Sequence, residues 1–253
     1  MLKKLTQERR DEIAKTLLTN GKISAPLLAK EYGVSAETIR KDLLYLEKNG
    51  IAKKGYGGAV VSTELNEQNF SEKSIRHQNE KLRIAAKAAE FVSDNDIVIL
   101  DSGSTTLAVA KQLVLKNKLT VFTNSLKAAQ LLSDAGVKLY MLGGAVQNTS
   151  SASTGHWAVQ ALAEIKVNIA FLGTSGFYQR GGPCVENYGE SEVKRAMITS
   201  ANKSILVADA SKAQSSAMIQ FAEWKDFDVM ITDKSIGDDT LDALQNKIEV
   251  MVV

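Results

Sequence analysis

The sequence predicts an α/β protein with two domains: a small N-terminal domain of short helices with a hairpin, and a larger domain built on a mostly parallel sheet. The larger domain is predicted by seven short apolar runs that alternate with helix-like segments over residues 96–253. Near-continuous Val, Ile and Leu strands with helices between them are typical of a parallel sheet covered on both faces. The small domain is predicted by residues 24–58, where two short helices and a glycine-rich hairpin follow one another. Charge also separates the two, because residues 1–60 hold 12 Lys and Arg against 7 Asp and Glu, and the remainder holds 19 against 22.

The first helix is expected over residues 6–19. Thr6 is a suitable N-terminal cap, and Gly21 is a suitable end. Ile13, Leu17 and Leu18 form its apolar side.

A second, shorter helix is expected over residues 25–32. Ser24 is expected to cap it, and Pro26 falls in its first turn, where a missing N–H costs little. Gly33 stands where a left-handed residue ends a helix.

A third helix follows within two residues. Ser35 caps the segment SAETIRKDLLYLEKNG, which we expect to end at Gly50. Ile39, Leu43 and Leu46 recur at i, i+4 and i+7, so they form one apolar stripe. Two helices joined by so tight a turn form a helix-turn-helix, the geometry that lays its second helix in a DNA major groove.

The other side of this third helix is polar. Arg40 and Lys41 could reach guanine edges or phosphates, and Thr38 could reach a base or a phosphate. An ordinary amphipathic surface helix carries similar solvated charges, so the helix alone leaves both interpretations open.

The hairpin that follows favours DNA binding. Two β-prone runs surround Gly55, Gly57 and Gly58, and they carry Lys53 and Lys54. A lysine-bearing hairpin after such a helix resembles the wing of a winged-helix domain, and the local basic excess agrees with an electrostatic footprint on double-stranded DNA. We therefore expect residues 1–61 to form a winged helix-turn-helix domain. Its expected DNA contacts are Ser35, Ala36, Glu37, Thr38, Arg40, Lys41, Lys53, Lys54 and Tyr56.

Residues 62–74, STELNEQNFSEKS, are polar and weakly patterned, and we expect them to be a linker. The larger domain then covers residues 75–253. It begins with a helix over roughly residues 76–91, whose buried stripe is Ile84, Ala88 and Phe91.

Composition excludes several classes of protein. The single Cys184 rules out an internal disulfide, and with only His77 and His156 beside it no metal site is expected. No apolar run approaches the ~20 residues of a membrane span, and the N-terminus lacks the apolar region of a secretion signal. We expect a cytoplasmic protein without a metal or other cofactor.

Several predicted strands run into small or hydroxylic residues. These junctions are DSGSTT at residues 101–106, TNS at 123–125, a glycine pair at 143–144 and DASK at 209–212. In open α/β sheets the ligand lies beyond the carboxyl ends of the strands, where helix-start N–H groups and hydroxyls bind anions. Helix capping would explain each junction alone, but their convergence favours a small anionic ligand.

Particular residues of these junctions suit a phosphorylated sugar. Gly103 permits close backbone approach, and Lys212 could balance the charge of a phosphate. Asp101 and Asp209 could accept hydrogen bonds from sugar hydroxyls.

Two sequence features limit the choice of ligand. Neither a Walker A motif nor a GxGxxG follows any predicted strand, so nucleotide hydrolysis and dinucleotide binding are disfavoured. Lys194 and Arg195 lie in a helix that begins near Glu190, and they either reach the ligand or are surface charges.

The motifs together resemble the DeoR family of transcriptional regulators over nearly the whole chain. The N-terminal motifs are RRDEI, VSAETIRKDLLYLEKNG and YGGAV, and those of the larger domain are DSGSTT, TNS, LGG, FLGTSG, VKRAM and ADASK. Each motif is weak alone, and their order and spacing make the set specific.

This resemblance implies a repressor, usually of a sugar-utilisation operon, whose sensor domain is similar in fold to ribose-5-phosphate isomerase and binds a phosphorylated sugar. We expect a homo-oligomer, a dimer or a tetramer, that places two reader helices on an operator. By the resemblance, the effector contacts are Asp101, Gly103, Ser104, Thr105, Thr106, Thr123, Asn124, Gly143, Gly144, Asp209 and Lys212.

The chain departs from the family pattern at three positions. Lys41 stands where a second Arg is frequent, so the charge stays but the bidentate fork is lost. Tyr56 stands where His is frequent, and Asn168 replaces a frequent Asp. If that Asp contributes to the pocket in relatives, this protein is expected to differ from them in its ligand or in the contacts that hold the ligand.

The alternative is an isomerase-like enzyme with an accessory DNA-binding domain. Such chemistry needs a positioned general base, and Asp101, Asp209 and Glu190 are available. The larger domain lacks the acid-rich DGADE-like run of isomerases of this fold. We therefore expect a regulator with no catalytic residues.

Overall fold

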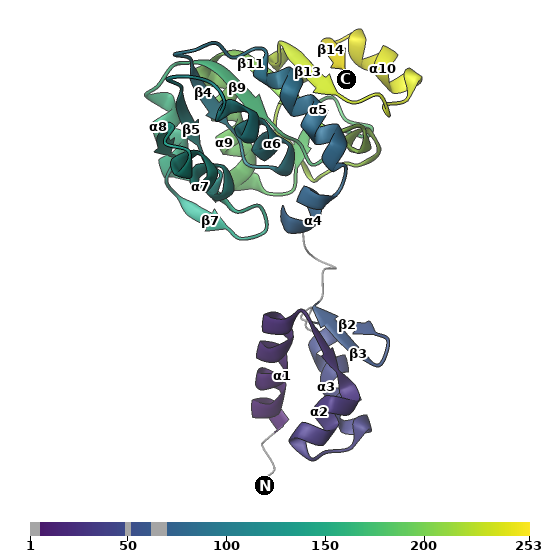
Figure 1. The fold of residues 1–253 in the computed structure, drawn as a ribbon. Coiled ribbons are helices and arrows are strands. Elements are labelled where there is room, and N and C mark those ends of the chain that lie inside the picture. The colour runs from purple at the N-terminus through teal and green to yellow at the C-terminus, as the bar shows by residue number, and fades with distance from the viewer. Residues whose placement is uncertain (1–5, 49–51, 62–69) are drawn as a thin grey trace. The chain divides into compact units, whose positions relative to one another are not determined.

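The computed structural model describes residues 6–48, 52–61 and 70–253. The chain divides into two compact units, residues 1–68 and residues 69–253 (Figure 1). Each unit has a hydrophobic core of its own.

In residues 6–48 and 52–61, the N-terminal unit contains three helices and a small antiparallel sheet. Its elements are α1 (Thr6–Asn20), β1 (Lys22–Ser24), α2 (Ala25–Tyr32), α3 (Ala36–Lys48), β2 (Ala52–Gly55) and β3 (Gly58–Val61). The strands lie in the order β1-β3-β2, and β2 and β3 are the predicted hairpin. The predicted winged helix-turn-helix is confirmed, while the predicted helix end at Gly50 lies outside the described residues.

The turn between α2 and α3 forms as predicted. Gly33 ends α2 with a left-handed backbone, at a φ of 63°. The Ser35 hydroxyl accepts a hydrogen bond from the Thr38 N–H at 3.1 Å, which caps α3.

The start of α2 is held by the wing instead of by its own cap. Ser24 occupies the predicted N-cap position of α2, but its side chain makes no capping hydrogen bond. The Ala25 N–H donates instead to the Gly57 carbonyl at 3.0 Å. Gly58 allows this close packing, since a Cβ there would lie 1.9 Å from the Ile23 carbonyl oxygen.

The apolar stripes of α1 and α3 meet in the core of this unit. The predicted core residues that are buried there are Ile13, Leu17, Ile39, Leu43 and Leu46. The side chain of Leu18 lies outside the described part of the structure.

A buried ion-pair cluster ties α1 to α3. The Asp42 carboxylate, on a residue only 1% exposed, accepts hydrogen bonds from Arg9 Nε at 2.7 Å and from Arg10 Nε at 2.9 Å. The Arg10 guanidinium also lies 4.0 Å from the Tyr45 ring centroid. Asp42 therefore adds a buried polar link to the apolar contacts that hold the reader helix α3 against α1.

The C-terminal unit is built on a seven-stranded parallel sheet in the order β14-β13-β11-β9-β4-β5-β6. These strands are β4 (Ile97–Leu100), β5 (Thr120–Thr123), β6 (Lys138–Met141), β9 (Val167–Leu172), β11 (Ala201–Val207), β13 (Val229–Thr232) and β14 (Glu249–Val252). All seven apolar runs that the sequence indicated lie in this sheet. The prediction of a parallel α/β domain is confirmed.

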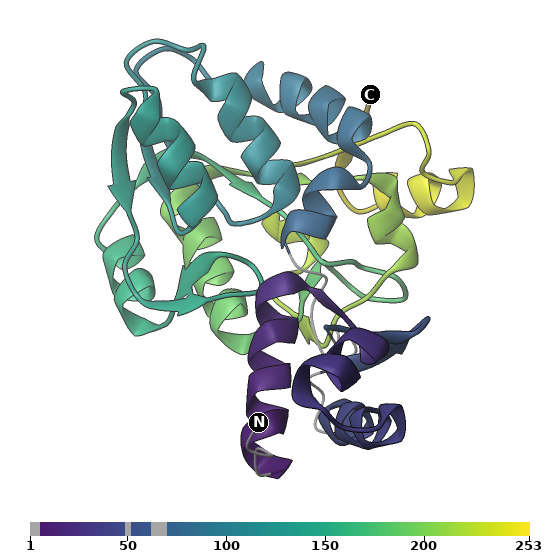
Figure 2. The ribbon, with the colours of Figure 1, turned by 60° about the horizontal axis from the view of Figure 1, so that its bottom comes forward.

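Helices cover both faces of the sheet (Figures 1 and 2). One layer contains α5 (Gln78–Ala89), α6 (Ser104–Leu113) and α7 (Leu126–Asp134), and the other contains α8 (His156–Ala163), α9 (Tyr188–Ser200) and α10 (Asp238–Gln245). Alternation along β4 shows why, because Val98 and Leu100 belong to the first core cluster and Ile99 to the second.

The predicted linker and the helix after it differ from the structure. Residues 62–69 lie outside the described residues, but α4 (Phe70–Ile75) is helical, and His77 separates it from α5 with a φ of 52°. The buried Lys81 ammonium stabilises α4 by donating to the carbonyls of Lys73 and, at 2.6 Å, of Arg76. Sequence periodicity does not report such tertiary capping.

Replacing Asp42 with Ala should destabilise the N-terminal unit by about 3 kcal/mol, since the buried Arg9 guanidinium would lose its counter-charge. Hydrogen exchange of the full-length protein would show faster exchange in α1 and α3, with α5 and α6 unchanged. Asp11→Ala, an exposed carboxylate of α1, is the control. Equal protection of α1 in both variants would contradict the role given to Asp42.

Candidate functional site

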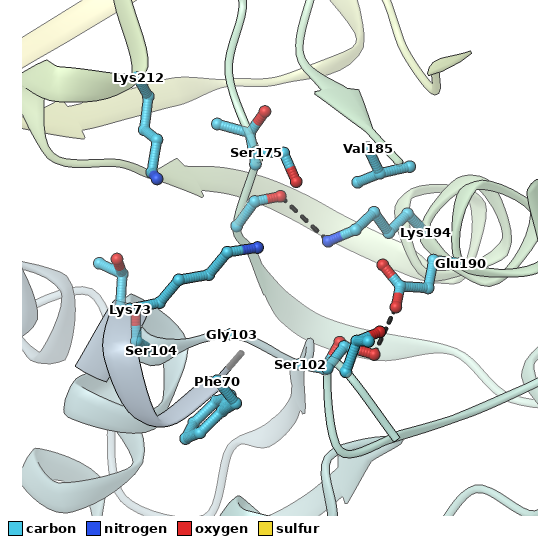
Figure 3. Close-up of a pocket in the computed structure, with 15 residues that line it drawn as sticks. Phe70, Lys73, Ser102, Gly103, Ser104, Ser175, Val185, Glu190, Lys194 and Lys212 are labelled. Carbon is cyan, nitrogen blue, oxygen red and sulfur yellow. Dashed lines mark hydrogen bonds between the residues drawn. The ribbon is translucent and has the colours of Figure 1, made fainter. Parts of the chain in front are cut away.

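A pocket opens at the carboxyl edge of the parallel sheet, where α4, the start of α6 and the start of α9 meet (Figure 3). Loops that leave β4, β9 and β11 contribute to its walls. Its lining residues are Phe70, Lys73, Ser102, Gly103, Ser104, Thr105, Thr149, Ser150, Gly173, Thr174, Ser175, Val185, Glu190, Lys194 and Lys212.

The start of α6 forms one wall of the pocket. Gly103 has a φ of 152°, a conformation that favours glycine, and the Thr106 hydroxyl donates to its carbonyl at 3.0 Å. Ser104 and Thr105 follow in the first turn, whose backbone N–H groups have no partner inside the helix. Such N–H groups are suited to bind an anion.

A buried ion pair lies at the floor of the pocket. The Lys194 ammonium donates to the Asp101 carboxylate and, at 3.0 Å, to the Gly173 carbonyl. The Gly173 N–H donates to the same Asp101 oxygen at 2.9 Å. The Lys194 and Asp101 side chains are 4% and 0% exposed, so their mutual pairing must offset a large desolvation penalty.

The two cations that the sequence left open have different places. Lys194 lines the pocket, whereas Arg195 does not. The Arg195 guanidinium donates to the carbonyls of Phe221 and Gln220, at 3.1 and 3.0 Å. Arg195 therefore fixes a loop backbone.

Positive charge gathers on the opposite side, where Lys73 and Lys212 reach into the pocket (Figure 3). Burial lowers the pKa of Lys212; Asp209 opposes this shift, while the cations Lys73 and Arg76 add to it. Burial also lowers the pKa of Lys81, and Lys212 and Lys73 lower it further. Neighbouring cations that lower the pKa of a buried lysine create a place where an anion is stabilised.

Part of the predicted effector set lines this pocket: Gly103, Ser104, Thr105 and Lys212. Asp101 lies beneath it, bonded to Lys194. The other predicted contacts do not line it. Their roles as effector contacts stay predictions.

The predicted contacts that do not line the pocket are held by structural bonds. The Thr123 hydroxyl donates to the Leu100 carbonyl at 2.6 Å, the Asn124 amide donates to the Ser153 carbonyl at 3.2 Å, and Asp209 accepts from Ser211. Thr106 bonds to Gly103. Gly143 and Gly144 precede the hairpin of β7 (Ala145–Gln147) and β8 (Ala152–Thr154), and a Cβ on Gly144 would lie 2.2 Å from the Thr154 carbonyl oxygen.

Several lining residues were not predicted as contacts. Thr174 and Ser175 follow the predicted strand NIAFLG, so the strand-end rule applied to that junction would have found them. Phe70 and Lys73 lie in the segment that the sequence indicated as linker. Glu190 was named only as an available general base of the isomerase alternative, and not as an effector contact.

Asn168 lies at the other edge of the sheet. Its side-chain oxygen accepts from the Ile97 N–H at 2.8 Å, which joins the amino ends of β9 and β4. The departure from the family pattern at Asn168, where Asp is frequent, therefore lies outside the pocket.

The predicted DNA contacts lie on one face of α3 and on the wing. Ser35, Ala36, Glu37, Arg40, Lys41, Lys53, Lys54 and Tyr56 are exposed, and Thr38 is half-buried. Arg40 pairs with Glu37 at 3.2 Å, and the hydroxyls of Ser35 and Thr38 lie 2.8 Å apart. An exposed arginine beside lysines at the start of a reader helix suits contact with bases and phosphates.

A winged helix-turn-helix joined to an α/β unit with a cation-rich pocket defines a DNA-binding regulator with a small-molecule sensor. The DeoR-like helix-turn-helix domain matches residues 9–65, and the DeoR C-terminal sensor domain matches residues 76–234. The chain belongs to the DeoR family of transcriptional regulators.

Named relatives cover nearly the whole chain. The regulator GolR of Listeria innocua is 36% identical and covers 91% of each chain, and the repressor GlcR of Bacillus subtilis is 32% identical over 97% of this chain and 96% of its own. GlpR of Haloferax volcanii is a regulator with 29% identity over 96% of this chain and 95% of its own. The prediction of a regulator is confirmed over the isomerase alternative.

Solved structures similar to part of this chain include two sugar-phosphate isomerases. Ribose 5-phosphate isomerase A from Neisseria gonorrhoeae matches with a TM-score of 0.39 and 21% identity, over 53% of each chain. The isomerase from Methanocaldococcus jannaschii matches with a TM-score of 0.37 and 19% identity, over 53% of this chain and 54% of its own. Among the described residues, no helix is long and apolar enough to cross a membrane, and no group of three or more His, Cys, Asp or Glu could hold a metal ion.

Arg40→Ala should weaken operator binding by about 1–3 kcal/mol more than it weakens binding to random DNA, because a base contact discriminates between sequences. Fluorescence anisotropy at fixed salt would measure both affinities, with Lys15→Ala on α1 as the control. An equal loss on both DNAs would assign Arg40 to a phosphate.

Proposed function

We propose that this protein is a repressor of a sugar-utilisation operon and that a phosphorylated sugar, bound in the pocket, relieves repression. GlcR, which is named a repressor, is similar over nearly the whole chain. The protein acts in the cytoplasm as a homo-oligomer that places two reader helices on an operator.

The placement of Lys73 and Lys212 beside the start of α6 carries this proposal. A phosphate between them would accept hydrogen bonds from two ammonium groups and from backbone N–H groups of Ser104 and Thr105. Hydroxyls of Ser102 and other lining residues are available to the rest of a sugar.

The energy of the switch requires more than one contact. Inverting operator occupancy needs a preference of ~5.5 kcal/mol for one state, whereas a Lys–phosphate hydrogen bond contributes ~1.5–3 kcal/mol. In this proposal α4 supplies a further part, because it carries Lys73 and follows the segment that leads from the DNA-binding unit. Subunit contacts supply the remainder.

The proposal is tested by titrating the full-length protein onto DNA from its own upstream region, with random DNA as the control. The titration is repeated with a panel of sugar phosphates at fixed salt. Specific binding that one sugar phosphate abolishes would support the proposal. Specific binding that none of them changes would contradict the assignment of the pocket.

Lys212→Met should lose the response to sugar phosphates, because it removes one ammonium group while it keeps the volume of the side chain. Operator binding in the presence and absence of the sugar phosphate would measure this loss. Lys111→Met, an exposed lysine of α6, should respond like the natural protein. An unchanged response in Lys212→Met would remove Lys212 from the site.

Binding of inorganic phosphate should weaken with rising pH at a lower pH than an ordinary lysine, with a pKa of 10.5, would allow. The pKa of Lys212 is lowered in the empty pocket and rises when an anion binds, so above the lowered pKa each binding event must take up a proton. Calorimetry in buffers of different ionisation enthalpy would measure this uptake. Lys212→Arg, which stays protonated, should flatten the pH dependence; an equally steep dependence in that variant would contradict the assignment.

A further inference from the structure

The end of the pocket opposite Lys73 and Lys212 is acidic. Glu190, on the first turn of α9, is only 6% exposed, and its carboxylate accepts a hydrogen bond from the Ser150 hydroxyl. Asn187 fixes this turn, because its side chain accepts from the Glu190 N–H at 3.2 Å. Figure 3 shows Glu190 and Lys194 reaching in from this side.

Two carboxylates lie close together at this acidic end. Glu190 lines the pocket, and Asp101 lies beneath it, paired with the Lys194 ammonium. Two of the three N–H donors of Lys194 are used on Asp101 and Gly173. One oxygen of Asp101 is buried and has no hydrogen-bond partner among the described residues. This end therefore accepts hydrogen bonds from a ligand and repels a second anion.

We propose that the pocket selects a singly phosphorylated sugar by its two opposite ends, and that Glu190 is the specificity-determining residue that excludes a second phosphate. The phosphate lies at Lys73 and Lys212, and a hydroxyl of the sugar donates to the Glu190 carboxylate. This inference rests on the proposed function of the pocket as a sugar-phosphate site.

The hydrogen bond from Ser150 does not by itself explain why residue 190 carries a negative charge. A glutamine amide oxygen would accept the same hydrogen bond from Ser150 without the desolvation cost of a buried carboxylate. A charged group facing the space that a second phosphate would occupy gives discrimination by repulsion as well as by attraction.

Isothermal titration of the full-length protein would test this with inorganic phosphate, ribose 5-phosphate, glucose 6-phosphate, fructose 6-phosphate and fructose 1,6-bisphosphate. We expect one of the monophosphates to bind more tightly than inorganic phosphate, and the bisphosphate to bind about tenfold more weakly than that monophosphate. In Glu190→Gln this ratio should fall to near unity. The readout is a ratio within one variant, so a reduced folded fraction affects both ligands equally.

Glu192→Gln is the matched control, because it removes an exposed carboxylate of α9 that does not line the pocket. It should keep the ratio of the natural protein. A ratio that collapses in Glu192→Gln would assign selectivity to the general charge of α9 and overturn the role of Glu190.

The outcomes separate this inference from the proposed function. Equal affinity of the natural protein for mono- and bisphosphate, an unchanged ratio in Glu190→Gln, or no monophosphate better than inorganic phosphate would each overturn the inference. In all three cases the sugar-phosphate site would still be supported if the natural protein binds phosphate and Lys212→Met does not. No binding of any phosphate compound would overturn both.

Discussion

The sensor unit depends on one topological constraint: its seven sheet strands run in the same direction, so their carboxyl ends lie along a single edge. Every loop that leaves β4, β9 and β11 therefore meets the others there. Residues distant in sequence, such as Gly103, Gly173 and Lys212, line one pocket for this reason. The two helix layers bury both faces of the sheet and leave its edges for chemistry.

The electrostatics of the pocket depend on which charged side chains at that edge have partners within the protein. Asp101 extends β4 into the floor, and its pairing with Lys194 and with the Gly173 N–H offsets its desolvation. Lys194 therefore pairs with Asp101 beneath the pocket, whereas Lys73 and Lys212 are the cations that the proposed function assigns to a ligand. The result is a polar gradient across the pocket, from cations beside α4 to carboxylates beside α9.

The sequence predicted most of the fold because its signals are local. Near-continuous apolar runs such as DIVIL and NIAFLG identify central parallel strands, and Gly33 and Ser35 define the turn of the reader by their own backbone chemistry. The Ser24 side chain makes no capping hydrogen bond because its helix start is satisfied by the wing, a contact between segments far apart in sequence. Of the site, the start of α6 and Lys212 were predicted from strand ends, and the same rule would have found Thr174 and Ser175.

The rest of the site was not predictable, because it depends on tertiary contacts. A six-residue helix such as α4 has no periodicity to detect. It forms where the buried Lys81 ammonium bonds to the Lys73 carbonyl in the helix and to the Arg76 carbonyl just after it. Glu190 and Lys194 have the spacing of an ordinary surface pair, i and i+4. Only the packing of α9 against the sheet turns this pair inward.

The same tertiary dependence makes α4 suited to transmit a signal. A helix too short to be stable alone is ordered by its neighbours, here by Lys81 and by the hydrogen bond from the Phe70 N–H to the Thr149 carbonyl at 3.1 Å. A ligand held by Lys73 would add to those contacts, and part of its binding free energy would stabilise the ordered state of α4. Residues 62–69 connect α4 to the wing in sequence. In the function proposed above, a change in the order of α4 would therefore affect the DNA-binding unit through the chain, without direct contact between ligand and DNA.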